Sequence, residues 1–126
     1  MEQLKIPPGY QQVMVYLIVN GAADFINWTQ QIFGAKEKMR HMRDEHIIAH
    51  AEITIGDCVI MLADATEAFP ARNVGFFIYM ADADAVYNKA INAGAIVVSP
   101  MADMPYGRSG GVTDPFGNTW WITCQM

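Results

Sequence analysis

An internal repeat constrains this sequence more than any other feature, because both halves place the same elements in the same order. An apolar run at 13–19 precedes an amphipathic stretch at 22–33, and a second apolar run at 74–80 precedes a similar stretch. Apolar runs predict buried strands, and apolar residues recurring every three to four positions predict helices with one buried face. Asn20 and Asp82 precede the two predicted helices and are their expected N-caps.

The second half of each repeat keeps the same spacing. Both predicted helices end at a glycine, Gly34 or Gly94, the residue most common just after the last helical turn. Each half then reaches a tight turn containing Gly56 or Gly117, and an apolar strand follows. The two glycines of a half are 22 positions apart in the first half and 23 in the second. The halves are therefore in register almost residue for residue.

Two further strands fit between helix and turn in each half. In the first half, 35–43 and 47–55 form a predicted hairpin around Asp44-Glu45, and in the second half 95–98 and 107–114 take these places. The 47–55 segment alternates in polarity, and alternate residues of a strand point to opposite faces of a sheet. One face is expected to carry Ile47, Ala49, Ala51, Ile53 and Ile55, and the other His46, Ile48, His50, Glu52 and Thr54.

These patterns predict an α+β fold built from two tandem βαβββ modules. We expect a single domain over 1–126, with module one at about 10–64, a linker at 65–73 and module two at about 74–125. The amphipathic helices would cover one face of the sheet. The opposite face would be free to line a site.

Composition excludes several functional classes. With 126 residues, 52% of them hydrophobic, the chain can bury a core and is not a disordered protein. Its longest apolar runs are far shorter than the ~20 residues of a membrane-spanning helix. Eight basic against thirteen acidic residues make nucleic acid a poor partner. No leader pattern opens the chain, so a cytoplasmic location is expected. Cys58 and Cys124 lie in apolar runs, and we expect both to be buried free thiols.

Several motifs resemble a known group of proteins. They are Ile-Ala-His-Ala-Glu-Ile at 48–53, Ile-Gly-Asp at 55–57, Tyr-Gly-Arg-Ser at 106–109 and Asp-Pro-Phe-Gly at 114–117. With the repeat, they resemble the vicinal-oxygen-chelate superfamily of glyoxalases, bleomycin-resistance proteins and extradiol dioxygenases, within its PhnB-like or glyoxalase-like branch. The likeness runs from about Pro8 to the C-terminus. It implies that the two modules form one cup-shaped curved sheet with the helices outside, and that the protein pairs as a homodimer.

The resemblance also implies where a metal would bind. Metal-dependent members hold one divalent ion with His, Glu or Gln from the first and last strands of each module. Carried over, those positions fall on Met14, Gly75, Trp121 and either Ile60 or Met61, none of which is a ligand for a hard cation. We therefore expect no metal and no cofactor. This departure argues against a glyoxalase I, an extradiol dioxygenase or a metal-dependent fosfomycin transferase.

His50 and Glu52 are the candidate catalytic pair. Two positions apart on a strand, they share a face at a separation of about 7 Å. A neighbouring carboxylate can raise the pKa of an imidazole and orient its ring for general base catalysis. The structural alternative, which we favour, is that both side chains are solvated or bond across strands. With His46 they would span too great a length of strand to ligate one ion, so a metal held by His50 and Glu52 would need a third ligand from another strand.

Aromatic residues supply the second signal. Tyr16, Phe77, Tyr79 and Trp121 fall on the free face with Met14, where they would stack flat or cationic ligands. The alternative is that this face packs in a dimer. Tyr106 and Arg108, in a glycine-rich loop, could anchor an oxyanion, or Arg108 could cap and steady the loop backbone.

Together these features predict a metal-independent small-molecule-binding protein of the glyoxalase/bleomycin-resistance type. It would sequester a drug or metabolite, with an aromatic or cationic compound as its ligand. The alternative function is a lyase, isomerase or hydrolase acting on a small oxygenated substrate. In that case His50 and Glu52 serve as acid and base, and Tyr106 and Arg108 hold the substrate. A purely structural dimerising module has no specific feature in its favour.

Overall fold

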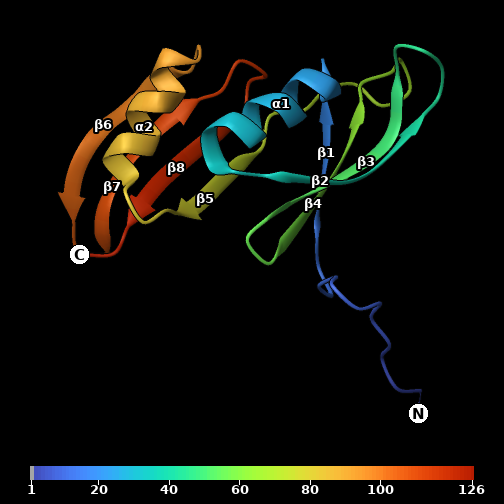
Figure 1. Ribbon diagram of the computed structural model, residues 1–126, viewed down its shortest axis with the longest axis horizontal. Coiled ribbons are helices and arrows are strands. Elements are labelled where there is room, and N and C mark those ends of the chain that lie inside the picture. Colours follow the sequence, from blue (N-terminus) through green and yellow to red (C-terminus); the bar gives the residue numbers. More distant parts are fainter. Residues whose placement is uncertain (1) are drawn as a thin grey trace. The chain divides into compact units, whose positions relative to one another are not determined.

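The computed structural model describes residues 2–126 and contains two compact units, unit 1 up to Ala71 and unit 2 from Arg72 (Figure 1). Each unit has one helix and four strands, in the order strand, helix and three strands. The fold is α+β with two tandem βαβββ modules, as the repeat predicted. Unit 1 consists of β1 (Val15–Val19), α1 (Ala22–Phe33), β2 (Lys36–Met42), β3 (Ile48–Ile55) and β4 (Cys58–Asp64). Unit 2 consists of β5 (Gly75–Tyr79), α2 (Ala83–Asn92), β6 (Ile96–Met104), β7 (Gly107–Thr113) and β8 (Thr119–Cys124).

Both sheets have the same topology. The strand order is β1-β4-β3-β2 in unit 1 and β5-β8-β7-β6 in unit 2. The first strand of each unit pairs in parallel with the last, and the other pairs are antiparallel. Antiparallel neighbours need only short turns, whereas a parallel pair needs a longer connection. This topology places the first strand of each unit at one edge of its sheet and the last strand beside it, inside the sheet.

One face of each sheet packs on the helix of its own unit. In unit 1, Leu17, Ala51 and Leu62 are aligned across three strands, and all three are fully buried. Burial of such apolar side chains is the main favourable contribution to folding. The core of unit 1 also includes Phe25, Ile26 and Ile32 of α1, and that of unit 2 includes Tyr87, Ala90, Val112, Trp120 and Ile122.

The two helices begin differently. Helix α2 starts as predicted, with the Asp82 carboxylate accepting a hydrogen bond from the Ala85 N–H at 3.1 Å. The prediction for α1 was wrong, because its N-cap is Gly21 rather than Asn20. Gly21 has a φ of +89° and no side chain to cap the helix, so the cap comes from the sheet. Asp64 Oδ1, at the end of β4, accepts from the Ala22 N–H at 2.7 Å.

The alternation predicted for β3 fails at its N-terminal end. His41 pairs with His50 and Met42 with Ile48, so Ala49 is an extra residue on β3. Such a bulge shifts the residues before it to the opposite face. Ile48 is therefore buried and Ala49 exposed, the reverse of the prediction.

The cysteines also differ from expectation. Both are free, but Cys58 is exposed because it is the first residue of β4, directly after the turn. Cys124, the last residue of β8, is partly exposed. No helix within residues 2–126 is long and apolar enough to span a membrane.

Candidate functional site

The open face of unit 1 is the side of its sheet that carries Tyr16, Ile18, His50 and Glu52. Tyr16 is aligned with Met61 of β4, and Met61 is aligned with Glu52 of β3. Because alternate residues point to opposite sides, this row faces away from the buried row that contains Leu17. His50 and Glu52 thus share the open face, as predicted, and Tyr16 lies on the same side two strands away.

A chain of hydrogen bonds joins four side chains on this face. The Tyr16 hydroxyl lies 2.9 Å from His50 Nδ1, and His50 Nε2 lies 2.8 Å from Glu52 Oε2. The Tyr10 hydroxyl, from the segment before β1, donates to Glu52 Oε1 at 2.6 Å. The Lys38 Nζ lies 3.6 Å from the centroid of the Tyr10 ring, so a cation covers the outer side of that ring. We name this set the Tyr16–His50–Glu52–Tyr10 chain.

The charge state of Glu52 determines which atom is the donor in each hydrogen bond of this chain. The residue is only 4% exposed. Burial alone would raise its pKa, but the hydrogen bonds from Tyr10 and His50, with the charges of His50 and Lys38, outweigh burial and lower the pKa below its usual value of 4.5. The ionised carboxylate can only accept, so His50 Nε2 donates to it. When the imidazole is neutral, its Nδ1 must then accept from the Tyr16 hydroxyl.

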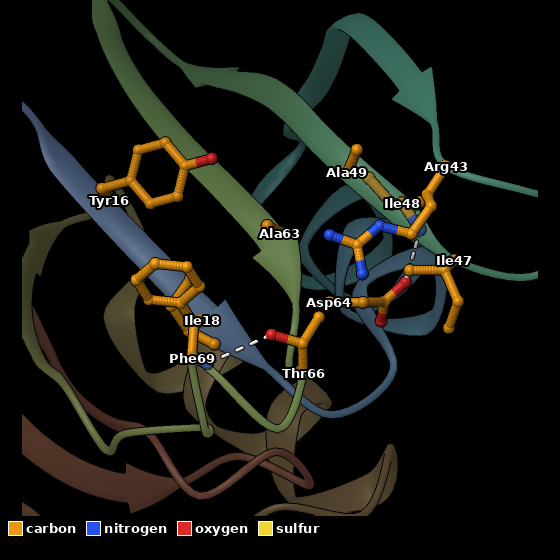
Figure 2. Close-up of a pocket in the computed structure, with 10 residues that line it drawn as sticks. All are labelled: Tyr16, Ile18, Arg43, Ile47, Ile48, Ala49, Ala63, Asp64, Thr66 and Phe69. Carbon is orange, nitrogen blue, oxygen red and sulfur yellow. Dashed lines mark hydrogen bonds between the residues drawn. The ribbon is translucent and has the colours of Figure 1, made fainter.

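Beside this chain, the structure holds a pocket of about 530 Å³ (Figure 2). Its walls come from the ends of β1 and β4, the start of β3, the β2–β3 hairpin and the loop after β4. Figure 2 shows the rings of Tyr16 and Phe69 toward one end and the guanidinium of Arg43 toward the other, with Ala63 between them. Tyr16 is the one residue that both lines this pocket and belongs to the hydrogen-bonded chain. The lining residues are Tyr16, Ile18, Arg43, Ile47, Ile48, Ala49, Ala63, Asp64, Thr66 and Phe69.

Asp64 is the acidic residue of the pocket, and its oxygens already have partners. Oδ1 accepts from the Ala22 N–H and Oδ2 from the Ile48 N–H, each at 2.7 Å. The carboxylate therefore joins the N-terminus of α1 to the start of β3. A carboxylate at this end of a helix is stabilised by the helix dipole. Asp64 thus shapes the pocket wall, and each of its carboxylate oxygens already accepts a backbone hydrogen bond.

The open face of unit 2 carries exposed aromatic side chains instead. Phe77, Tyr79 and Trp121 are 50%, 64% and 37% exposed. The ring centroid of Phe77 lies 5.4 Å from that of Tyr79 and 5.9 Å from that of Tyr106. The Trp121 indole lies over Gly111, where an added Cβ would be 2.5 Å from the indole Cζ3. The structure thus brings Phe77, Tyr79 and Tyr106 together.

Arg108 does not join this aromatic group. Its guanidinium binds both carboxylate oxygens of Asp84 in α2, at 2.7 and 3.0 Å, and also Asp103 of β6 at 3.0 Å. The hydrogen bonds to Asp84 and then Asp103 hold the pKa of Arg108 above its usual value. Arg108 thus ties β6 and β7 to α2 by side-chain ion pairs. Met14, the remaining predicted contact, precedes β1 and is half-buried.

No group of three or more His, Cys, Asp or Glu side chains within residues 2–126 is arranged to hold a metal ion. His50 and Glu52 bind each other, and the third ligand that a metal would require is not among their neighbours in the hydrogen-bonded chain. The open face of unit 1 presents aromatic rings, apolar side chains and a hydrogen-bonded hydroxyl, imidazole and carboxylate.

The sequence did not single out Tyr10, Arg43, Asp64 or Phe69 as site residues. Tyr10 and Phe69 lie outside the periodic segments, and Arg43 ends a predicted strand. Asp64 gave one usable signal, since it is a carboxylate that directly follows an apolar strand. The other three carry no local pattern that indicates a site.

Comparison with known proteins identifies the family. The Glyoxalase/Bleomycin resistance protein/Dioxygenase superfamily matches residues 10–122. The Mycobacterium bovis protein Mb0911c is 31% identical over 117 residues, which cover 83% of this chain and 77% of that protein. Similar solved structures include TioX from Micromonospora sp. ML1, with a TM-score of 0.72, 24% identity and 92% and 97% of the two chains covered. TnmS3, an antibiotic binding protein from Streptomyces sp. CB03234, has a TM-score of 0.69, 16% identity and 92% and 98% covered. The chain belongs to the Glyoxalase/Bleomycin resistance protein/Dioxygenase superfamily.

Proposed function

We propose that this protein binds a small organic molecule in the pocket of unit 1, without a metal ion, and so sequesters a drug or metabolite. The observation that carries this proposal is the pocket itself, of about 530 Å³ and lined by apolar side chains and the rings of Tyr16 and Phe69. Small-molecule sites have this size and this mixture of apolar walls with a few polar groups. The fold shared with TnmS3, which is described as an antibiotic binding protein, supports the same reading.

The metal-independent part of the proposal rests on residue chemistry. The positions that correspond to the superfamily's metal ligands hold Met14, Gly75, Trp121 and either Ile60 or Met61. Thioether, indole and alkyl groups do not bind hard divalent cations. The exposed rings of Phe77, Tyr79 and Trp121 remain predicted ligand contacts, and the homodimer expected from the sequence remains a prediction.

The first experiment measures binding of an uncharged aromatic probe, N-phenyl-1-naphthylamine, by its fluorescence. We expect wild-type protein to bind the probe, and Phe69→Ala to weaken binding about tenfold because one of the two aromatic walls is lost. Ile96→Ala is the matched control, since it removes an exposed apolar side chain from β6 of unit 2. Equal affinity of the Phe69→Ala and Ile96→Ala variants would contradict a binding site in this pocket.

The Tyr16–His50–Glu52–Tyr10 chain favours a second candidate, proton transfer by a lyase, isomerase or hydrolase on a small oxygenated substrate. The Glu52 carboxylate accepts a hydrogen bond from the N–H at His50 Nε2, so His50 Nδ1 is free to take the proton of the Tyr16 hydroxyl. The tyrosinate oxygen can then remove a proton from a substrate carbon beside a carbonyl group. In this scheme Tyr16 touches the substrate. His50 accepts the Tyr16 proton, and the Glu52 carboxylate stabilises the imidazolium that forms.

Proton NMR in D₂O tests this candidate with phenylpyruvate, whose methylene protons are acidic. We expect wild-type protein to exchange these protons with solvent faster than buffer does, and Tyr16→Phe to reduce the exchange to the buffer rate. His50→Ala should do the same while the naphthylamine probe still binds. Exchange by wild-type protein at the buffer rate would oppose the enzymatic candidate and leave binding as the function.

A further inference from the structure

The pocket of unit 1 contains one cation, Arg43, whose guanidinium forms no side-chain hydrogen bond or ion pair within residues 2–126. Arg43 lines the pocket, and its backbone N–H donates to the Ile47 carbonyl at 2.8 Å, which holds this residue at the pocket edge. Figure 2 shows its guanidinium turned inward from the hairpin, on the side where Ile48 and Asp64 lie. Within the described residues, no hydrogen bond or ion pair occupies this guanidinium.

The nearest acidic residues are committed to backbone groups. Asp64 accepts from two backbone N–H groups, as described above. Asp44, the neighbour of Arg43 in sequence, accepts with Oδ1 from the backbone N–H groups of His46 and Ile47, at 2.7 and 2.9 Å. Both carboxylates thus stabilise local backbone structure, and neither lies within ion-pair distance of the Arg43 guanidinium. The backbone hydrogen bonds lower the pKa of Asp44, with a smaller contribution from the charge of Arg43. Arg43 is therefore the pocket's cationic group whose N–H donors are open to a ligand anion.

We propose that the pocket selects flat apolar molecules that carry an anionic group, a carboxylate or sulfonate, and that Arg43 binds this group. This inference rests on the proposed binding function and deepens it. The aromatic rings of Tyr16 and Phe69 lie at the opposite end of the pocket from Arg43 (Figure 2). A ligand can therefore stack its rings at one end and place its anionic group at the other.

The chemistry of the two ends supports this ligand class. A guanidinium presents several N–H donors in a plane that matches the oxygens of a carboxylate or sulfonate. The chain's net charge of −5 opposes an anion at long range, but charges beyond ~8 Å are screened at physiological ionic strength. Screening therefore weakens the effect of acidic residues outside the pocket, whereas the Arg43 guanidinium can contact the bound anion directly. The sequence led us to expect an aromatic or cationic ligand. The ligand proposed here keeps the aromatic rings but carries a negative instead of a positive charge.

Two dyes that share a hydrocarbon framework separate charge from stacking. 8-Anilino-1-naphthalenesulfonate carries a sulfonate, and N-phenyl-1-naphthylamine lacks it. We expect wild-type protein to bind the sulfonate about tenfold more tightly. Arg43→Met keeps a long apolar side chain without the charge, so the two dyes should then bind within twofold of each other. Arg43→Lys should retain most of the preference. Arg40→Met is the control, because the Arg40 guanidinium is already paired with Glu37 at 2.7 Å.

The outcomes distinguish the two proposals. If neither dye binds wild-type protein, the proposed binding function fails and this inference with it. If both dyes bind wild-type protein equally, or if Arg43→Met weakens both by the same factor, anion selection by Arg43 is wrong while binding in the pocket stands. An equal loss of sulfonate affinity in Arg40→Met would also overturn it, since a general charge effect would then explain the preference. Circular dichroism of each variant confirms that the fold is retained.

Discussion

The open faces of the two units have the same strand pairing but different chemistry. In unit 1 the aligned row across the first, last and third strands is Tyr16, Met61 and Glu52. In unit 2 the equivalent row is Phe77, Trp121 and Gly111. The backbone repeat is thus kept, while the phenol, thioether and carboxylate of unit 1 are replaced by a phenyl ring, an indole and a glycine in unit 2.

Glu52 and Gly111 show the difference most clearly, because they occupy equivalent places. The Glu52 carboxylate is buried and receives hydrogen bonds from Tyr10 and His50. At Gly111 the Trp121 indole occupies the space in which a side chain would begin. An indole in van der Waals contact with backbone cannot move protons. The hydrogen-bonded hydroxyl, imidazole and carboxylate that proton transfer would need therefore lie on the open face of unit 1, and unit 2 offers aromatic surface.

The helix starts give a second comparison, and they lead to the largest expected effect. Asp64 caps α1 from β4 and also binds the Ile48 N–H, whereas Asp82 caps α2 alone and is exposed. We expect Asp64→Ala to lower the free energy of unfolding by about 3 kcal/mol, because two hydrogen bonds to a charged group are lost. Asp82→Ala should cost only about 1 kcal/mol, the usual value of an N-cap. Equilibrium urea unfolding followed by circular dichroism measures both.

Asp64→Asn sharpens this comparison, since an amide has one acceptor oxygen and can replace only one of the two bonds. The free energy of unfolding of Asp64→Asn should lie between the values for Asp64→Ala and wild type. If Asp64→Ala and Asp82→Ala prove equal, the bond to Ile48 contributes nothing and the comparison between the two helix starts is wrong.

Most of the fold could be predicted because it depends on short-range periodicity. The element order of both units, the hairpin between 35–43 and 47–55, and the shared face of His50 and Glu52 all follow from alternation and from glycine placement. The Asp82 cap also followed from a local pattern. The Ala49 bulge did not, because it is a property of the pairing between β2 and β3 and leaves no mark in the composition of either strand.

The site was only partly predictable, since it depends on contacts between distant parts of the chain. Tyr10 reaches Glu52 across a sequence separation of 42 residues. Phe69 belongs to the segment that was expected to be a linker, and the loop after β4 brings it to the pocket. Arg108 was expected, from its residue type and its glycine-rich loop, either to anchor an oxyanion or to steady the loop. No local pattern indicated that its partners would be Asp84 of α2 and Asp103 of β6.

The last prediction concerns Glu52 and has a smaller effect at neutral pH. In Glu52→Gln the amide oxygen can still accept from Tyr10, and the amide NH₂ can donate to His50 Nε2. The imidazole must then carry its proton on Nδ1 and donate it to the Tyr16 oxygen. We expect a loss of about 1 kcal/mol at pH 7, because a charge-assisted bond becomes a neutral one. The Tyr16 hydroxyl can no longer pass its proton to His50, so any exchange of phenylpyruvate protons should stop.

The pH dependence of stability tests the same residue with a fixed sign. The pKa of Glu52 in the folded protein lies below the usual value of 4.5, so Glu52 stabilises the fold above about pH 4.5, and this contribution is lost as the pH falls through the folded pKa. Urea midpoints should therefore decline less steeply in Glu52→Gln than in wild type below pH 4.5. Arg108→Met, which breaks ion pairs of exposed carboxylates in unit 2, provides the comparison in the other unit. Parallel acid profiles of wild type and Glu52→Gln would show that the buried carboxylate does not set the acid sensitivity of unit 1.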